Sequence, residues 1–118
     1  MNFKFFSLSE FDCPSLPDSG INMDSQFLAK LEQAREIAGI PFKITSGYRT
    51  KEHNAEVGGV PNSSHLVGVA ADIAVSGGAD RYIILNALIK AGFKRIGVAK
   101  TFIHCDTDET KSNSVWTY

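Results

Sequence analysis

Apolar side chains recur at helical spacing in two long segments of the chain. The first segment predicts a helix that begins after the capping residue Asp24 and ends before Gly39-Ile40-Pro41, with an apolar face of Phe27, Leu28, Leu31, Ala34 and Ala38. The second predicts a helix over residues 79–91, with Ile84, Leu88 and Ala91 on one stripe. Between them, a shorter helix is predicted from Thr50 to Val57, where Gly58-Gly59 stops it.

Shorter runs of apolar and β-branched residues predict strands. They cover residues 42–45, 70–75, 94–98 and 101–106, and residues 114–118 add an edge strand, while residues 60–64 form a loop. This order predicts an α+β fold, with helices packed on one side of a small, mainly antiparallel sheet. The other side of the sheet is then free to hold a site. No repeat or linker interrupts the pattern, so we expect residues 1–118 to form a single domain.

Composition and charge exclude several kinds of partner. The 118 residues are 43% hydrophobic and 21% charged, which is typical of a globular protein, and the formal net charge is −1. A charge near zero provides no basic field for nucleic acid or for an anionic membrane surface, so we expect neither. No segment reaches the roughly 20 apolar residues of a membrane span. The first residues lack the apolar core of a secretory signal, so we expect cytoplasmic synthesis without a signal peptide.

Three other apolar or reactive side chains have structural interpretations. Cys13 and Cys105 are the only cysteines, and we expect both to be small buried hydrophobes, although a single disulfide between them stays open. Trp116 is either a core residue or a platform for substrate. We expect core packing, because large aromatic side chains are usually buried.

The chemistry of the chain centres on two histidines and one aspartate. Asp72 lies in an apolar run, where an unpaired charge is costly unless a cation or hydrogen bonds satisfy it. His65 precedes it, and His104 follows in a strand whose alternation places His104 and Asp106 on one face, opposite Ile103. A single histidine usually has a structural role, but two imidazoles and one carboxylate suit an open catalytic zinc site. Other first-row ions also accept this ligand set.

The residues around these side chains resemble a known family. Ser63-x-His65-x-x-Gly68-x-Ala70-x-Asp72 follows Ile44-Thr45-Ser46-Gly47-Tyr48-Arg49 and precedes Phe102-Ile103-His104-Cys105-Asp106. Together these three segments resemble the zinc D-alanyl-D-alanine carboxypeptidase family of murein peptidases. That family includes the L-alanyl-D-glutamate endopeptidases used as phage endolysins, and its metal core is similar to that of the hedgehog domain. The resemblance implies that His65, Asp72 and His104 bind one Zn²⁺.

The resemblance also implies roles for residues around the metal. Arg49 matches the arginine that holds the substrate carbonyl as negative charge develops on it. Thr101 stands where many members carry an acid, three positions before the last histidine, and threonine is no general base near neutral pH. Asp106 is the best substitute on strand geometry, with a ligand-orienting role as the alternative. Asp108, Glu109 and His53 are weaker candidates for the base, and the expected contacts to substrate are Tyr48, Ser63 and His53.

These observations predict metal-assisted amide hydrolysis in the stem peptides of peptidoglycan. Zinc activates water, a carboxylate takes up the proton, and Arg49 stabilises the oxyanion. The bond is of the D-Ala-D-Ala carboxypeptidase or the L-Ala-D-Glu endopeptidase type, and a phage or prophage endolysin, released to act on the cell wall, is a plausible setting. We expect a monomer. The alternatives are a non-catalytic zinc-binding interaction module with the same fold and a metal-free binding domain.

Overall fold

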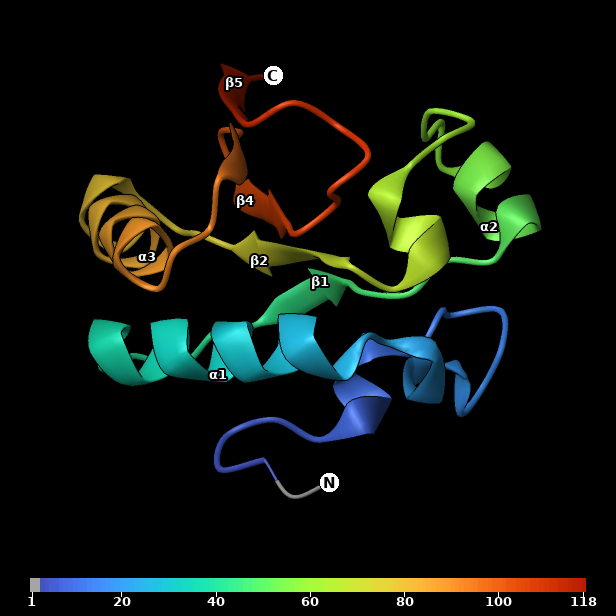
Figure 1. The fold of residues 1–118 in the computed structure, drawn as a ribbon, viewed down its shortest axis with the longest axis horizontal. Coiled ribbons are helices and arrows are strands. Elements are labelled where there is room, and N and C mark those ends of the chain that lie inside the picture. Colours follow the sequence, from blue (N-terminus) through green and yellow to red (C-terminus); the bar gives the residue numbers. More distant parts are fainter. Residues whose placement is uncertain (1–2) are drawn as a thin grey trace.

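The computed structural model describes residues 3–118 as an α+β fold built around a five-stranded sheet (Figure 1). The strands are β1 (Ile44–Ser46), β2 (Ala70–Ala74), β3 (Arg95–Val98), β4 (Phe102–Asp106) and β5 (Ser114–Thr117), in the spatial order β1-β2-β4-β3-β5. Every pairing is antiparallel except that of β5 with β3, which is parallel. The predicted α+β class with a mainly antiparallel sheet is confirmed.

The helices begin and end at the predicted signals. In α1 (Ser25–Ala38), Asp24 Oδ2 accepts a hydrogen bond from the Phe27 amide at 2.9 Å, and Gly39 ends the helix with a φ of 69°. Thr50 caps α2 (Lys51–Glu56), and α3 spans Gly78–Lys90. Three 3₁₀ helices were not predicted, because four residues are too few to establish a period: η1 (Leu8–Phe11), η2 (Ser19–Asn22) and η3 (Ser64–Val67).

Two of the helices cover one face of the sheet. The largest buried side chains there come from α1, α3 and the strands: Phe27, Leu31, Ile84, Leu88, Ile73, Ile96 and Ile103. By contrast, α2 buries a single residue, Asn54, which is polar, and it lies away from α1 and α3 (Figure 1). The opposite face of the sheet is therefore left to polar and aromatic side chains.

Both cysteines behave as predicted. Cys13 and Cys105 are free and buried, with 1% and 0% of their surface exposed. Burial raises the pKa of the Cys105 thiol well above its ordinary value, and the negative charges of Asp72 and Asp106 raise it further. The two cysteines therefore pack as small hydrophobes and do not form a disulfide.

Within residues 3–118, no helix has the length and apolar character needed to cross a membrane.

The N-terminal segment is attached to α1 through one carboxylate. Glu32 Oε1 accepts hydrogen bonds from the amides of Phe5 at 2.9 Å and Phe6 at 2.8 Å, and Oε2 accepts one from Lys4 at 3.2 Å. This contact brings the Phe6 ring onto the core, where it meets Phe11 edge to face. Residues 4–6 therefore depend on Glu32 for their position.

Replacing Glu32 tests this attachment. Glu32→Gln leaves a single acceptor oxygen for three amide donors, so we expect the free energy of unfolding to fall by about 1.5 kcal/mol. Chemical denaturation followed by circular dichroism measures the change. Glu52→Gln is the control, because Glu52 is an exposed residue of α2. An equal effect of the two substitutions would show that Glu32 does not anchor the segment.

Candidate metal centre and active site

A single row of residues crosses all five strands on the face turned away from α1 and α3. Strand register pairs Ser46 with Asp72, Asp72 with His104, His104 with Gly97, and Gly97 with Trp116. Paired residues of adjacent strands project from the same face of a sheet. The row therefore brings together side chains that lie far apart in the sequence.

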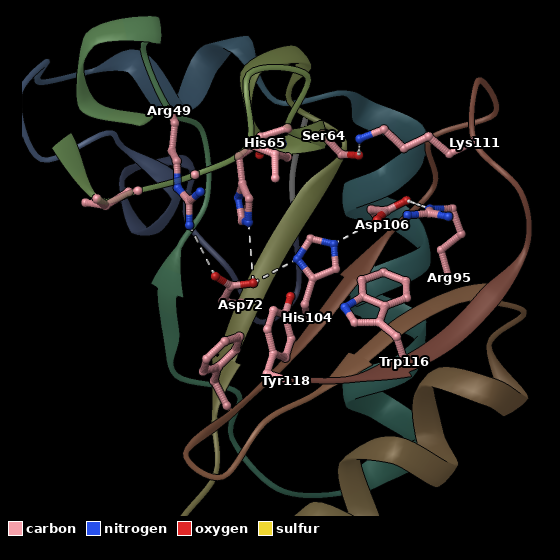
Figure 2. A pocket seen from close by; sticks show the side chains of 16 residues that line it. Arg49, Ser64, His65, Asp72, Arg95, His104, Asp106, Lys111, Trp116 and Tyr118 are labelled. Carbon is pink, nitrogen blue, oxygen red and sulfur yellow. Dashed lines mark hydrogen bonds and ion pairs between the residues drawn. The ribbon is translucent and has the colours of Figure 1, made fainter. Parts of the chain in front are cut away.

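Three of the candidate ligands converge at this row. Asp72 lies on β2, His104 lies on β4, and His65 reaches over from η3, as Figure 2 shows. Asp72 Oδ1 is 2.9 Å from His104 Nδ1 and 3.4 Å from His65 Nε2. All three residues are buried, and their ligand atoms lie within 4.8 Å of one another. In a tetrahedral zinc site with bonds of about 2.0–2.1 Å, two ligand atoms are about 3.4 Å apart. The spacing fits one such ion.

The hydrogen bonds behind the ligands decide which ring nitrogens carry a proton. His65 Nδ1 lies 2.7 Å from the carbonyl oxygen of Gly47, which only accepts, so Nδ1 is the donor and Nε2 presents a lone pair to Asp72. His104 Nε2 lies 2.7 Å from Asp106 Oδ2 and donates to it in the same way. In the neutral ring, His104 Nδ1 then also presents a lone pair to Asp72 Oδ1. Three acceptors then face one point, which a proton carried by one of the rings or a metal cation satisfies.

The charges of these groups point the same way. Burial raises the pKa of Asp72, but hydrogen bonds from His104 and His65 outweigh it and hold that pKa well below its ordinary range. Burial lowers the pKa of His104, but hydrogen bonds to Asp106 and Asp72 raise it above its ordinary value. The carboxylate stays ionised and attracts positive charge to its Oδ1 atom. The donor set and its protonation fit a divalent metal ion.

The guanidinium of Arg49 lies at the edge of this cluster. Its Nη2 is 3.5 Å from Asp72 Oδ2, the carboxylate oxygen that faces away from the two histidines. Ser46 Oγ accepts from Nε at 3.0 Å, and Asn54 Oδ1 accepts from Nη1 at 3.1 Å. Asn54 is itself fixed, since its Nδ2 donates to the Val60 carbonyl at 2.8 Å. Arg49 is therefore held beside the ligands and does not extend into solvent.

The comparison with known families agrees with this geometry. Residues 4–106 match the profile of the family described as Peptidase M15. This chain belongs to the Peptidase M15 family. The match confirms the resemblance drawn from the three motifs and identifies the chain as a metallopeptidase. No curated protein matches the chain.

In this M15 peptidase, Asp106 lies behind His104 as seen from the ligand cluster (Figure 2). Its Oδ2 accepts from His104 Nε2, and its Oδ1 accepts from Arg95 Nε at 2.8 Å and from the Asp108 amide at 3.0 Å. Only 1% of Asp106 is exposed. The expected general base would face the open coordination position, whereas this carboxylate faces the opposite nitrogen of the ring. The placement matches the ligand-orienting alternative.

A cavity of about 370 Å³ opens over the ligands of the M15 peptidase. Of the expected substrate contacts, Ser63 lines it, but Tyr48 and His53 do not. Tyr48 packs against the hydrophobic core, and His53 Nδ1 lies 4.0 Å from Glu56 Oε2 on the same helix, α2. Within the described part of the chain, Asp72 and Asp106 are the only carboxylates that line the cavity. Asp108 and Glu109 do not line it, and neither does Thr101.

Trp116 forms a wall of this cavity, which corrects the expectation that it packs in the core. Its ring lies 5.5 Å from that of His104, and the Arg95 guanidinium stacks on it at 4.9 Å. The reason is Gly97, which stands between Trp116 and His104 in the row. A Cβ atom there would come within 2.5 Å of Trp116 Nε1. The missing side chain makes room for the indole above the sheet.

Several residues that shape the site were not predicted from the sequence. Arg95 and Gly97 had a usable signal, since alternation with buried Ile96 places both on the site face of β3. Lys111 had none, because its role depends on contacts between distant loops. Residues on strands were therefore within reach of pattern analysis, and residues on loops were not.

Gly97→Ala tests the arrangement of the indole. The new methyl group overlaps Trp116, so we expect the ring to move away from His104 toward water and its fluorescence emission to shift to longer wavelength. Trp116 is the only tryptophan of the chain, so the emission reports on this ring alone. Gly78→Ala is the control, because a Cβ atom at Gly78 meets no atom within 4 Å. Unchanged emission of Gly97→Ala would contradict the packing described for Trp116.

Proposed function

We propose that this M15 peptidase uses zinc to hydrolyse an amide bond in the stem peptides of peptidoglycan. The observation that carries the proposal is the convergence of two imidazole nitrogens and one carboxylate oxygen on a single point at the floor of a cavity. The bond is of the D-Ala-D-Ala carboxypeptidase type or of the L-Ala-D-Glu endopeptidase type. An endolysin of a phage or prophage, acting on the cell wall as a monomer after release, is the proposed setting.

In this proposal, His65 Nε2, Asp72 Oδ1 and His104 Nδ1 hold the ion. Zinc bound by three protein ligands lowers the pKa of a coordinated water and polarises a carbonyl. The protein fixes the ligands before the ion arrives, because the Gly47 carbonyl and Asp106 each hold one imidazole in the required tautomer. Little reorganisation is then needed on binding.

Arg49 is the proposed partner of the oxyanion. Its guanidinium is fixed by Ser46 and Asn54 and points an edge at the ligand cluster. A positive group already in place where negative charge develops stabilises the transition state without reorganisation. The nearby Asp72 carboxylate keeps the guanidinium close to the metal position. Ser63 lines the same cavity and remains the proposed polar contact to substrate.

For Asp106 we propose a positioning role. Its two oxygens bind His104, Arg95 and a backbone amide, so the carboxylate is fixed as an acceptor behind the ligand ring. A carboxylate in that place orients the imidazole and raises its basicity toward a metal. Hydrogen bonds from His104 and the Asp108 amide outweigh burial and hold the pKa of Asp106 below its ordinary value, so the carboxylate stays ionised.

One observation favours the alternative of a non-catalytic zinc-binding module. Of the carboxylates on residues 3–118, only Asp72 and Asp106 line the cavity, the first proposed as a ligand and the second placed behind His104. A module that keeps zinc for structure needs no further acid. Zinc binding without hydrolysis of any stem-peptide bond would select this alternative.

The proposed activity has a direct test. We expect purified protein to hold one zinc ion per chain and to release fragments from murein sacculi or synthetic stem peptides, identified by mass spectrometry. Asp72→Asn removes the central ligand charge and is expected to lose both zinc and hydrolysis. Asp18→Asn is the control, because Asp18 is exposed and does not line the cavity. Hydrolysis that persists in chelated protein would refute a metal-dependent reaction.

The role of Asp106 is tested by separating metal affinity from turnover. If Asp106 positions His104, Asp106→Asn weakens zinc binding about 10–100-fold, and activity returns in large part when zinc is raised to saturation. Competition with a chromogenic chelator measures the affinity, and peptide hydrolysis at saturating zinc measures kcat. Unchanged zinc affinity with lost turnover would instead identify Asp106 as the general base.

A further inference from the structure

Lys111 brings a third cation to the wall of the cavity. It lies in the connection between β4 and β5, far in sequence from the other cavity residues with which it makes contact. Its ammonium donates to the Asn62 carbonyl at 2.7 Å and to Ser64 Oγ at 3.0 Å. Ser64 directly precedes the ligand His65, so this ammonium lies against the segment that carries a metal ligand (Figure 2).

The charge of Lys111 is weakly neutralised by its surroundings. Both of its close partners are neutral oxygens, and its carboxylate neighbour, Asp108, lies at 3.5 Å. That carboxylate is also occupied, since Oδ2 accepts from Ser64 and Oδ1 accepts from Thr110. Hydrogen bonds from Thr110 and Ser64 outweigh burial and lower the pKa of Asp108 to about 2, and the Lys111 charge adds to this effect.

The other two cations of the cavity, Arg95 and Arg49, are each held in place by contacts with neighbouring side chains. Arg95 binds Asp106 at 2.8 Å and stacks on Trp116, and Arg49 is held by Ser46 and Asn54 beside Asp72. Three cations and two carboxylates line the cavity, and Asp108, which pairs with Lys111 from outside the lining, brings the numbers of charges level. A divalent ion at the ligands would make the cavity positive. A neutral peptide gains nothing from such a field, whereas a peptide with a carboxylate does.

We infer that Lys111 binds a carboxylate of the substrate peptide and thereby selects acidic stem peptides over their amidated forms. The inference rests on the proposed function and adds a specificity-determining residue to it. The ammonium offers a charge-assisted hydrogen bond to a carboxylate in the same cavity as the metal ligands. That carboxylate is either the C-terminal group of the peptide or the side chain of an internal acidic residue.

The other role open to Lys111 is purely structural. Together with Ser64 and Asp108 it ties the connection between β4 and β5 to the start of η3. Loss of this tie would disturb binding of every peptide equally. Carboxylate recognition instead predicts an effect that depends on the charge of one group of the ligand. The two roles are distinguishable by changing the lysine and the carboxylate in the same experiment.

The experiment compares Lys111→Met with wild-type protein, both loaded with zinc. Three forms of one synthetic stem peptide serve as probes: both carboxylates free, the C-terminal carboxylate amidated, and the internal carboxylate amidated. Stopped-flow quenching of Trp116, which lines the same cavity, measures the Kd before turnover, and product release measures kcat/KM. Lys100→Met is the control, because Lys100 is exposed and lies outside the cavity.

We expect amidation of one of the two carboxylates to weaken binding to wild-type protein about tenfold. The amidated peptide that binds weakly then identifies the carboxylate that Lys111 contacts. In Lys111→Met, the acidic peptide should bind about as weakly as that amide, and the amide should be almost unaffected. Equal losses for all three peptides would overturn the inference and leave the structural role. Charge-dependent binding without any hydrolysis would refute the proposed function while upholding the role of Lys111.

Discussion

The site depends on the carboxylate of Asp72, which lies between two imidazoles and a guanidinium on a nearly buried face of the sheet. Its Oδ1 atom meets His104 and His65, and its Oδ2 atom meets Arg49. A charge in such a place is unfavourable unless every lone pair has a partner. The surrounding residues meet this requirement through the contacts with His104, His65 and Arg49, and a cation bound between the three candidate ligands would meet it as well. The chemistry and the stability of this part of the fold therefore share one cause.

The second layer of the site sets the direction of each ligand. The Gly47 carbonyl and the Asp106 carboxylate each accept a hydrogen bond from one imidazole and so turn its other nitrogen toward Asp72. Arg95 holds Asp106 in turn and packs against Trp116, so a continuous chain of contacts joins the cavity wall to the metal ligands. The rigidity needed for a preorganised site comes from these contacts and not from the ligands themselves.

The strand-borne part of the site could be predicted from the sequence, because strand alternation and motif spacing fix which side chains share a face. Asp72 and His104 follow this rule, and the long helices followed from apolar spacing and caps. The position of Asp106 relative to the ring of His104 depends on a side-chain rotation that spacing does not determine. Trp116 was misjudged because its environment depends on Gly97, a neighbour across a parallel pairing that no local pattern indicates. Lys111 acts through loops that meet only in the folded protein.

Because the row crosses the five strands, the candidate metal ligands meet only when the strands pair in their native register. If β4 slipped by one residue against β2, His104 would turn into the core, and Ile103 or Cys105 would face the ligands instead. Such a misaligned sheet lacks one ligand and buries a polar ring among apolar side chains. An ion that binds only the native alignment therefore lowers its free energy relative to slipped ones. Metal binding would thus favour the native strand register during folding.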